Sequence, residues 1–294
     1  MARIITLGSL NLDFTYQLPK PLEVGETLSS LSYRCGAGGK GANQSIAAAR
    51  AGAEVYHAGR IGHDGALLRR TLADSGVKLD FLEEVETPTG HAVVLINDAG
   101  DNSIVLYGGA NRTIDETFID RVTSAANPGD ILLLQNEVTC ISHAMEAGRK
   151  AGMRVAFNFA PFDPKLAPEL PLSLCDVLFL NRIEAGGIAG KSDVEETLET
   201  LSRRFPKTEL VLTLGPEGAV ALTPAGEQFH ADSPRVEVVE TTAAGDTFIG
   251  YYLAAILDGF DTGRALERAC RAAALCCSRA GAAESIPTRA ELDR

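Results

Sequence analysis

Two short segments of this chain place glycines next to residues that can bind or activate a hydroxyl or phosphate group. The first, Gly36–Gln44, reads Gly-Ala-Gly-Gly-Lys-Gly-Ala-Asn-Gln and runs directly into a stretch with helical spacing. Glycines before a helix let the backbone turn sharply and approach a ligand, and the helix start adds free N–H groups. It is not a phosphate loop of the usual kind, because Gly41 occupies the position of the hydroxyl residue. Lys40 and Asn43 can hydrogen-bond a polyol, although a plain glycine turn before a helix explains the same residues.

The second segment, Thr241–Phe248, consists of small residues followed by a single carboxylate. Its sequence, Thr-Thr-Ala-Ala-Gly-Asp-Thr-Phe, ends an irregular stretch and begins a long helix, so consecutive N–H groups can converge on an anion. Because a carboxylate repels phosphate, Asp246 makes sense here as a base that accepts a proton from an attacking hydroxyl group. Taken alone, the segment is explained better by an Asp in the first helical turn that interacts with the helix dipole.

The composition is that of a folded intracellular protein with an acidic surface. The chain has 294 residues, of which 45% are hydrophobic and 22% charged, and its formal net charge is −12. This excess of negative charge disfavours nucleic acid and anionic lipid as partners. The six cysteines form no CxxC pair, and no apolar run has the length of a signal peptide or of a membrane span. We therefore expect a cytoplasmic protein with reduced thiols that binds neither nucleic acid nor membrane.

Short apolar runs alternate with longer segments of helical spacing, which predicts a parallel sheet covered by helices on both faces. The predicted strands are Ile4–Gly8, Ile131–Leu134, Arg154–Asn158, Val177–Leu180 and Leu210–Leu214. The predicted helices include Ala42–Ala51, Ala66–Ser75, Ile141–Ala151 and Val194–Phe205, and Gly245–Ala280 is also rich in helical spacing. The predicted fold class is therefore α/β, a single three-layer α/β/α domain over residues 1–294 with a mostly parallel central sheet.

Two segments outside this alternation have the composition of strands. They are Thr27–Arg34 and His91–Tyr107, the second with an Asn-Asp-Ala-Gly-Asp turn at residues 97–101. We expect them to form an antiparallel ribbon outside the main sheet. This ribbon would be a small β-sheet lid built from about residues 12–35 and 89–108.

Motifs along nearly the whole chain resemble those of the ribokinase/phosphofructokinase-B family of sugar kinases, and they occur in the family's order. Besides the two segments above, they are Gly-Ser-Leu-Asn-Leu-Asp at 8–13, Gln-Asn-Glu at 135–137, Asn-Phe-Ala-Pro at 158–161, Asn-Arg-Ile-Glu at 181–184 and Thr-Leu-Gly-Pro-Glu-Gly at 213–218. One such motif is a weak signal, whereas this many in order is a strong one. The resemblance implies a ribokinase-like fold and ATP-dependent phosphorylation of a primary hydroxyl group of a small sugar. The expected reaction converts ribose to ribose 5-phosphate.

The resemblance also implies a role for each matched residue. Asp246 would be the general base, beside an anion hole made by the N–H groups of Ala243, Ala244 and Gly245. The sugar hydroxyl groups would be bound by Asn11, Asp13, Gly39, Lys40, Asn43 and Glu137. The nucleotide would lie against Asn181, Thr213, Gly215 and Gly218. Glu184 would help to place Mg²⁺ and phosphate through water.

The chain departs from the family pattern at an implied site for a monovalent cation. Family members usually have Asp where Glu240 stands, and Glu is one methylene longer. The resemblance implies that Glu240 would hold K⁺ together with carbonyl groups of Thr242, Cys276, Arg279 and Gly281 and with Ser285. Ile249, Tyr251 and Cys270 also differ from the family, so the motifs do not fix which sugar is bound.

Two other functions are compatible with the motifs. A nucleoside kinase of the same fold would need aromatic stacking for a flat base, and a compact polyol suits the hydrophilic residues Asn11, Asp13, Lys40, Asn43 and Glu137 better. A non-catalytic sugar or nucleotide sensor is the other hypothesis, because a fold does not fix a function. The intact Asp246 argues against a sensor. Members of the family often pair through the lid, and unpaired strand edges favour pairing, so we expect a homodimer.

Overall fold

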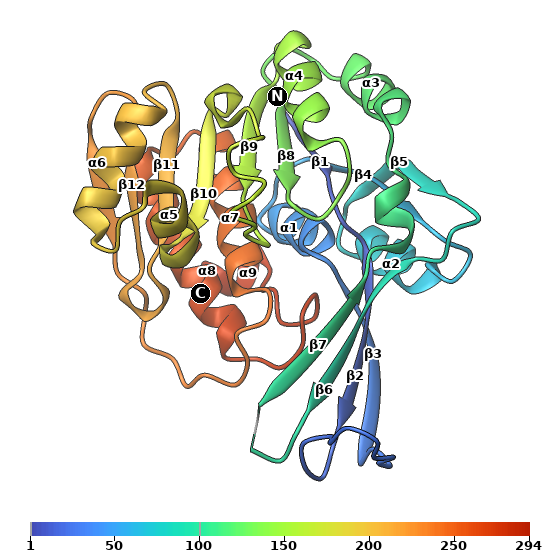
Figure 1. The fold of residues 1–294 in the computed structure, drawn as a ribbon. Helices are drawn as coiled ribbons and strands as arrows, with labels where there is room; N and C mark the ends of the chain where they lie inside the picture. Colours follow the sequence, from blue (N-terminus) through green and yellow to red (C-terminus); the bar gives the residue numbers. More distant parts are fainter. Residues whose placement is uncertain (1, 100) are drawn as a thin grey trace.

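The computed structural model describes residues 2–99 and 101–294, in which a nine-stranded sheet forms the centre of the fold (Figure 1). From one edge to the other the strands are β13 (Gln228–Ala231), β12 (Ala219–Leu222), β11 (Glu209–Thr213), β10 (Val177–Asn181), β9 (Arg154–Asn158), β8 (Ile131–Gln135), β1 (Ile4–Leu7), β4 (Val55–Ile61) and β5 (Lys78–Glu84). Only β12 and β13 run antiparallel to their neighbours among these pairs. The mostly parallel sheet is therefore confirmed. β4, β5, β12 and β13 are additional to the predicted strands, because polar residues or short length weaken their apolar pattern.

Helices cover both faces of the sheet, so the predicted three layers are confirmed. One face carries α1 (Lys40–Arg50), α2 (Ala66–Asp74), α7 (Ala244–Leu257), α8 (Thr262–Cys277) and the short α9 (Arg289–Leu292). The other carries α3 (Glu116–Ser124), α4 (Ile141–Lys150), α5 (Arg182–Ala189) and α6 (Val194–Arg204). Three 3₁₀ turns of the described chain are η1 (Gly109–Thr113), η2 (Leu172–Leu174) and η3 (Gly215–Glu217).

The strands separate two hydrophobic cores because successive side chains of a strand point to opposite faces. Ile4 packs in the core under α1 and α7, whereas Ile5 packs in the core under α3 and α4. Every residue of β1 and of β8 is buried. Burial on both faces explains why these strands are continuous apolar runs, which is why the sequence predicts them well.

The lid is a second sheet of four strands, which projects from the body beside the edge formed by the carboxyl ends of the strands (Figure 1). Its order is β3 (Ser32–Gly38), β2 (Asn11–Gln17), β6 (Gly90–Ile96) and β7 (Asn102–Tyr107). A small second sheet is as predicted, but a purely antiparallel ribbon is wrong, because β2 and β6 are parallel. The chain runs away from the body along β2 and β6, and it runs back toward the body along β3 and β7.

The structure corrects the start of one predicted lid strand, and one residue of the predicted lid turn lies outside the described residues. The segment Thr27–Arg34 becomes a strand only from Ser32, where pairing with Gln17 begins. For the strand to begin earlier, residues before Ser32 would have to pair with the segment that follows Gln17. That segment contains Pro19 and Pro21, which lack the N–H group that a strand ladder requires. In the predicted turn at 97–101, Gly100 lies outside the described residues, as does Met1 of the predicted domain.

The fold places the carboxyl ends of several parallel strands at one edge. β1 lies between β8 and β4, where the strand order reverses direction, and a crevice at such a point is the usual ligand site of an open α/β sheet. α1 begins directly over the end of β1. Gly39 has a φ of 91° there, and a Cβ atom on Gly41 would lie 2.5 Å from the carbonyl carbon of Gly8. Only glycine allows this approach.

Within residues 2–99 and 101–294, no helix is both long enough and apolar enough to span a membrane. The six cysteines are free thiols. Burial raises the pKa of Cys175 and of Cys270 to about 12, so these two thiols stay protonated and unreactive.

Candidate active site

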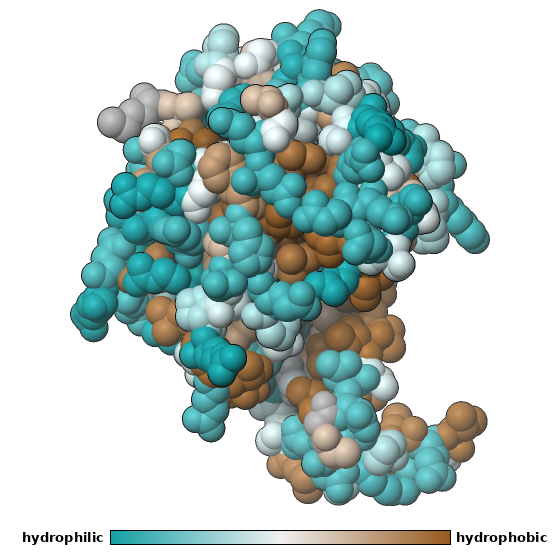
Figure 2. Space-filling model, turned by 90° about the vertical axis from the view of Figure 1, so that its left-hand side faces the viewer, coloured by the Kyte–Doolittle hydropathy of each residue, from teal (hydrophilic) through white to brown (hydrophobic). Residues whose placement is uncertain are grey.

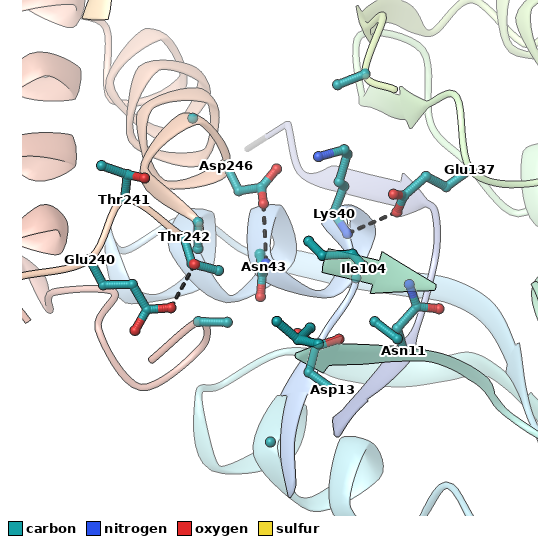
Figure 3. Close-up of a pocket in the computed structure, with 18 of the residues that line it drawn as sticks. Asn11, Asp13, Lys40, Asn43, Ile104, Glu137, Glu240, Thr241, Thr242 and Asp246 are labelled. Atoms are coloured by element: carbon teal, nitrogen blue, oxygen red, sulfur yellow. Dashed lines mark hydrogen bonds between the residues drawn. The ribbon is translucent and has the colours of Figure 1, made fainter. Parts of the chain in front are cut away.

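A cavity of about 880 Å³ lies between the lid and the carboxyl ends of the strands (Figure 3). Most predicted site residues line it, namely Asn11, Asp13, Gly39, Lys40, Asn43, Glu137, Asn181, Glu184, Thr213, Glu240, Thr242, Ala243, Gly245 and Asp246. The predicted residues that do not line it are Ala244, Gly215, Gly218, Cys276, Arg279, Gly281 and Ser285. The fold thus brings residues that are far apart in the sequence into one cavity.

Asp246 lies in the first turn of α7 and is only 8% exposed. The helix follows Ala243, whose left-handed φ of 61° turns the chain sharply before Asp246. Both carboxylate oxygens accept hydrogen bonds from α1: Oδ2 from Nδ2 of Asn43 at 3.1 Å and Oδ1 from Nε2 of Gln44 at 2.8 Å. The first of these bonds is drawn in Figure 3. A buried carboxylate needs such donors, so its position is defined by α1 as well as by α7.

Three amide side chains, those of Gln44, Gln135 and Asn158, lie behind Asp246 and were not predicted as site residues. Gln44 donates to Oδ1 of Asn158 at 3.1 Å and accepts from Nε2 of Gln135 at 2.7 Å. Gln135 ends β8 and Asn158 ends β9, and the two residues are paired across the sheet. The available signal was an amide at the end of each of two neighbouring buried strands.

The predicted anion hole is only partly open. The N–H group of Ala244 donates to the carbonyl of Thr241 at 3.2 Å and so closes the turn. The N–H groups of Ala243 and Gly245 have no hydrogen bond within the described part of the chain. These two amides are therefore the ones available to an anion in the cavity.

Glu137 and Lys40 lie together at the opposite wall of the cavity (Figure 3). The Glu137 carboxylate accepts from the backbone N–H of Lys40 at 3.1 Å and from the hydroxyl of Ser9, a residue without a predicted role. The charge of Asp246, and then those of Glu137 and Glu184, raise the pKa of the Lys40 ammonium despite its burial. Lys40 therefore remains a cation among carboxylates.

Asn11 and Asp13 lie on β2 at the base of the lid. The Oδ1 atom of Asn11 accepts from Nδ2 of Asn111 at 2.8 Å. Gly38 faces Asp13, and a Cβ atom there would lie 2.0 Å from Oδ2 of Asp13, so glycine makes room for the carboxylate. Burial, and then the charge of Glu137, raise the pKa of Asp13 to about 7.

The predicted nucleotide residues are divided between the cavity and a turn beside it. Asn181 caps α5 and exchanges two hydrogen bonds with Glu184, which at 2.8 and 2.9 Å hold the Glu184 side chain in place. Burial raises the pKa of Glu184, while the N–H of Asn181 and the charge of Lys40 oppose this change. Gly215 and Gly218 form the η3 turn after β11, both with positive φ, and stay an expectation as nucleotide contacts.

The predicted cation residues come from two segments that are in contact. Glu240 accepts from the hydroxyl of Thr242 at 2.6 Å and from the N–H of Gly281 at 2.8 Å. Cys276 and Ser285 meet at 3.1 Å. The guanidinium group of Arg279 turns away to Glu291, so only its carbonyl can face this cluster. Residues 2–99 and 101–294 contain no group of three His, Cys, Asp or Glu that could hold a metal ion.

Comparison with known proteins identifies clear relatives. The model of the pfkB family carbohydrate kinases matches residues 1–289. Ribokinase of Schizosaccharomyces pombe is 32% identical over 311 residues, which cover 100% of this chain and 97% of that protein. The structure of ribokinase from Cryptococcus neoformans var. grubii serotype A in complex with ADP superposes with a TM-score of 0.87 at 31% identity, covering 100% of this chain and 99% of that one. Arabidopsis thaliana ribokinase complexed with ribose and ATP gives a TM-score of 0.86 at 29% identity, covering 99% and 98%.

The raised pKa of Asp13 predicts that the stability of the folded protein depends on pH through this residue. A carboxyl group with a pKa of about 7 in the folded protein, against an ordinary 3.8, is favoured by folding in its neutral form. Its contribution to stability is complete below pH ~4 and is lost as the pH rises through ~7. Asp13→Asn is neutral at every pH, so its Tm relative to wild type should increase between pH 5.5 and pH 8, by about 2–4 °C per kcal/mol.

The matched control is Asp74→Asn, which removes the same charge from an exposed position at the end of α2. Its Tm difference from wild type should not grow in this way. If the Tm of Asp13→Asn falls relative to that of wild type as the pH rises, the raised pKa of Asp13 is wrong.

Proposed function

Because the chain belongs to the pfkB family of carbohydrate kinases, we propose that it transfers the γ-phosphoryl group of ATP to the 5-hydroxyl group of ribose. The relatives named as ribokinases, one of them complexed with ribose and ATP, support ribose as the acceptor. The observation that carries the proposal is the position of Asp246. Its carboxylate is held by two amides at a helix start, in the same cavity as Lys40 and Glu137.

Asp246 acts as the general base in the proposed reaction. The sugar O–H bond breaks while its oxygen bonds to the γ-phosphorus, the proton passes to the Asp246 carboxylate, and ADP leaves. The N–H groups of Ala243 and Gly245 bind the phosphoryl oxygens, where negative charge gathers in the transition state. Ala244 does not share this role, because its N–H group already donates to Thr241.

The sugar is bound by the polar residues at the lid end of the cavity, which are Asn11, Asp13, Gly39, Lys40, Asn43 and Glu137. The Oδ1 atom of Asn43 is buried without a hydrogen-bond partner in the described residues, so it is ready to accept from a hydroxyl group. The lid covers this end with aliphatic side chains, including Val94, Ile104 and Leu106. The cavity also contains Phe179, but this ring is 1% exposed and not available for stacking. A compact sugar therefore suits the site better than a nucleoside does.

Mg²⁺ accompanies ATP in this proposal. One carboxylate plus phosphate oxygens and water is a usual environment for Mg²⁺, which neutralises phosphate charge. Glu184 suits this role because Asn181 holds its side chain at the cavity wall. Asn181, Thr213, Gly215 and Gly218 contact the nucleotide.

K⁺ is the second proposed ion, held behind the anion hole by Glu240, Thr242, Cys276, Arg279, Gly281 and Ser285. The bonds of Glu240 to Thr242 and Gly281 bring the two segments together, which supports a site at this place. The same bonds occupy both carboxylate oxygens. This chain therefore depends on K⁺ less than a chain with Asp at this position.

We also propose a cytoplasmic homodimer in which two lids pair. The outer face of the lid carries Phe14, Tyr16, Tyr33, Val105 and Tyr107, and the last three are 54%, 66% and 47% exposed. Ring contacts join Phe14 to Tyr33 and Tyr16 to Tyr33. Figure 2 shows the lid as a protrusion below the body with hydrophobic side chains on its surface. Exposed apolar strands of this kind favour a protein partner, here a second copy.

Asp246→Asn is the central test of the function. The variant keeps the size of the side chain but cannot accept a proton, so kcat with ribose should fall by about 10²–10⁴-fold while the KM values change little. Activity is measured by ADP release over a panel of sugars and nucleosides, and Tm is measured on the same variants. Asp261→Asn is the matched control, because Asp261 only caps α8 and Asn caps helices equally well. Near-normal turnover of Asp246→Asn, or a wild type that prefers a nucleoside, would refute the proposal.

Glu240→Asp tests the cation site. The shorter side chain cannot keep both the Thr242 and the Gly281 bonds, which leaves an oxygen for K⁺. We expect potassium to stimulate Glu240→Asp more than wild type when activity in KCl is compared with activity in tetramethylammonium chloride. Glu237→Asp, an exposed position in the same segment, should respond like wild type. A larger potassium response in wild type would show that Glu240 serves the ion better than Asp.

Val105→Lys tests the dimer. A charge on the outer face of β7 should turn a dimer into a monomer in sedimentation or light-scattering measurements, while Tm changes little. Val105→Ile keeps the face apolar and should remain dimeric. A wild-type monomer, or an unaffected Val105→Lys dimer, would rule out pairing through this face.

A further inference from the structure

The amides behind Asp246 form, together with its carboxylate, a continuous hydrogen-bonded chain across four elements. Gln135 of β8 donates to Gln44 of α1, and Gln44 donates to both Asp246 of α7 and Asn158 of β9. Gln135 and Gln44 are 0% exposed. Neither lines the cavity, so neither is placed to contact the sugar or the nucleotide.

The order of donors and acceptors in this chain determines which way the Gln44 amide points. The Nε2 atom of Gln135 donates to Oε1 of Gln44 at 2.7 Å, so the Gln44 oxygen faces Gln135 and its NH₂ group faces Asp246. The reverse orientation would bring an amide oxygen against a carboxylate oxygen, and neither could donate. Asn158 favours the same orientation, because it presents Oδ1 to the NH₂ group.

The Gln135 side chain interacts through its NH₂ donor rather than through its oxygen acceptor. Its Oε1 atom is buried and has no hydrogen-bond partner among residues 2–99 and 101–294. A buried polar atom without a partner is unfavourable, so an apolar residue of similar size would cost less if packing were the only requirement. The favourable interaction of this side chain is the hydrogen bond that its Nε2 atom donates to Gln44.

Asn43 and Gln44 are neighbours that contact different oxygens of one carboxylate. Asn43 lines the cavity and holds Oδ2, whereas Gln44 holds Oδ1 and does not line the cavity. Among the charged groups of the cavity, Lys40 of α1 and Asp13 of β2 lie close enough to interact electrostatically with Asp246. β8 and β9 contribute only neutral amides to this chain. Gln44 can thus influence the carboxylate without altering the charge around it.

We infer that Gln44 is a positioning residue that holds the Asp246 carboxylate in its orientation, and that Gln135 sets the orientation of the Gln44 amide. The inference rests on the proposed function, in which Asp246 takes the proton of the sugar hydroxyl. A donor to the charged form of a carboxylate stabilises that form against protonation. Loss of the donor therefore moves the acid limb of the activity to higher pH.

Gln44→Leu is the first experiment, with ribose and ATP as substrates. We expect kcat to fall by about 10- to 100-fold, as for loss of one hydrogen bond to a charged group. Both KM values should stay within about threefold, because the residue does not line the cavity, and the acid limb of kcat should move up by about one pH unit. Asn43→Leu is the matched comparison, and it should also raise the KM for ribose. A Gln44→Leu enzyme with a normal kcat and acid limb would overturn the inference.

Gln135→Met and the double variant test the orienting role. Gln135→Met alone should move the acid limb in the same direction as Gln44→Leu, but by less. The double variant should be no slower than Gln44→Leu, because Gln135 acts only through Gln44. Additive losses, or a lowered Tm with an unmoved acid limb, would mean that the amides only support the fold. If Gln44→Leu does not fold, the acid limb of Gln135→Met decides.

Failure of this inference can be told apart from failure of the proposed function. A wild type without kinase activity on ribose refutes the function. An active wild type that loses activity in Asp246→Asn but not in Gln44→Leu refutes only the inference.

Discussion

The approach of α1 to α7 determines where the carboxylate of Asp246 lies. A Cβ atom on Gly250 of α7 would be 2.4 Å from the Cβ atom of Ala47 on α1, so glycine alone lets the two helices pack this closely. At its other end α1 rests on β1, where Gly41 meets Gly8 with the same lack of space. With α1 held against both elements, its amides reach a carboxylate that would otherwise be buried without donors. The position of the Asp246 carboxylate is thus a consequence of backbone packing.

The wall of the cavity combines carboxylates, a lysine and backbone N–H groups. The lid end contains the carboxylates Asp13 and Glu137, and the crowding of negative charge contributes to the raised pKa of Asp13. At the start of α7, beside the Asp246 carboxylate, the N–H groups of Ala243 and Gly245 have no hydrogen bond within residues 2–99 and 101–294. Lys40 lies among the carboxylates as a retained cation. In the proposed reaction the sugar would contact the groups at the lid end and the phosphoryl oxygens the N–H groups of Ala243 and Gly245, even though the whole chain carries a charge of −12.

The parts of the fold that the sequence predicts are those with a local signal. β1, β8, β9, β10 and β11 are buried on both faces, so their apolar runs are continuous. β5, with the sequence Lys-Leu-Asp-Phe-Leu-Glu-Glu, lies at the sheet edge and has no such run. The parallel pairing of β2 with β6 depends on where the chain leaves the body, which no local pattern contains.

The candidate site shows the same division. Most of the site residues that motif order indicated do line the cavity, since the glycine turns and Asp246 have recognisable neighbours. Gln44, Gln135 and Asn158 stand within those motifs, yet their roles were not predictable. Each belongs to a different element, and only the register of β8 with β9 and the packing of α1 bring them together. Similarly, the bond from Ala244 to Thr241 depends on the left-handed turn at Ala243, which residue types alone do not specify.

The proposed sugar contacts and the proposed base belong to different parts of the molecule. Asp13 lies on the lid strand β2, whereas Asp246 and its amide partners belong to the body. Asn11 is fixed to the body, because Asn111 of η1 donates to its side chain and accepts from the N–H of Leu10 at 2.9 Å. Asn11 is thus tied to the body at the start of β2, whereas Asp13 lies two residues further along this strand. In the proposed reaction the lid and the body must therefore act together, because the proton can pass to Asp246 only when groups such as Asp13 hold the sugar hydroxyl beside it.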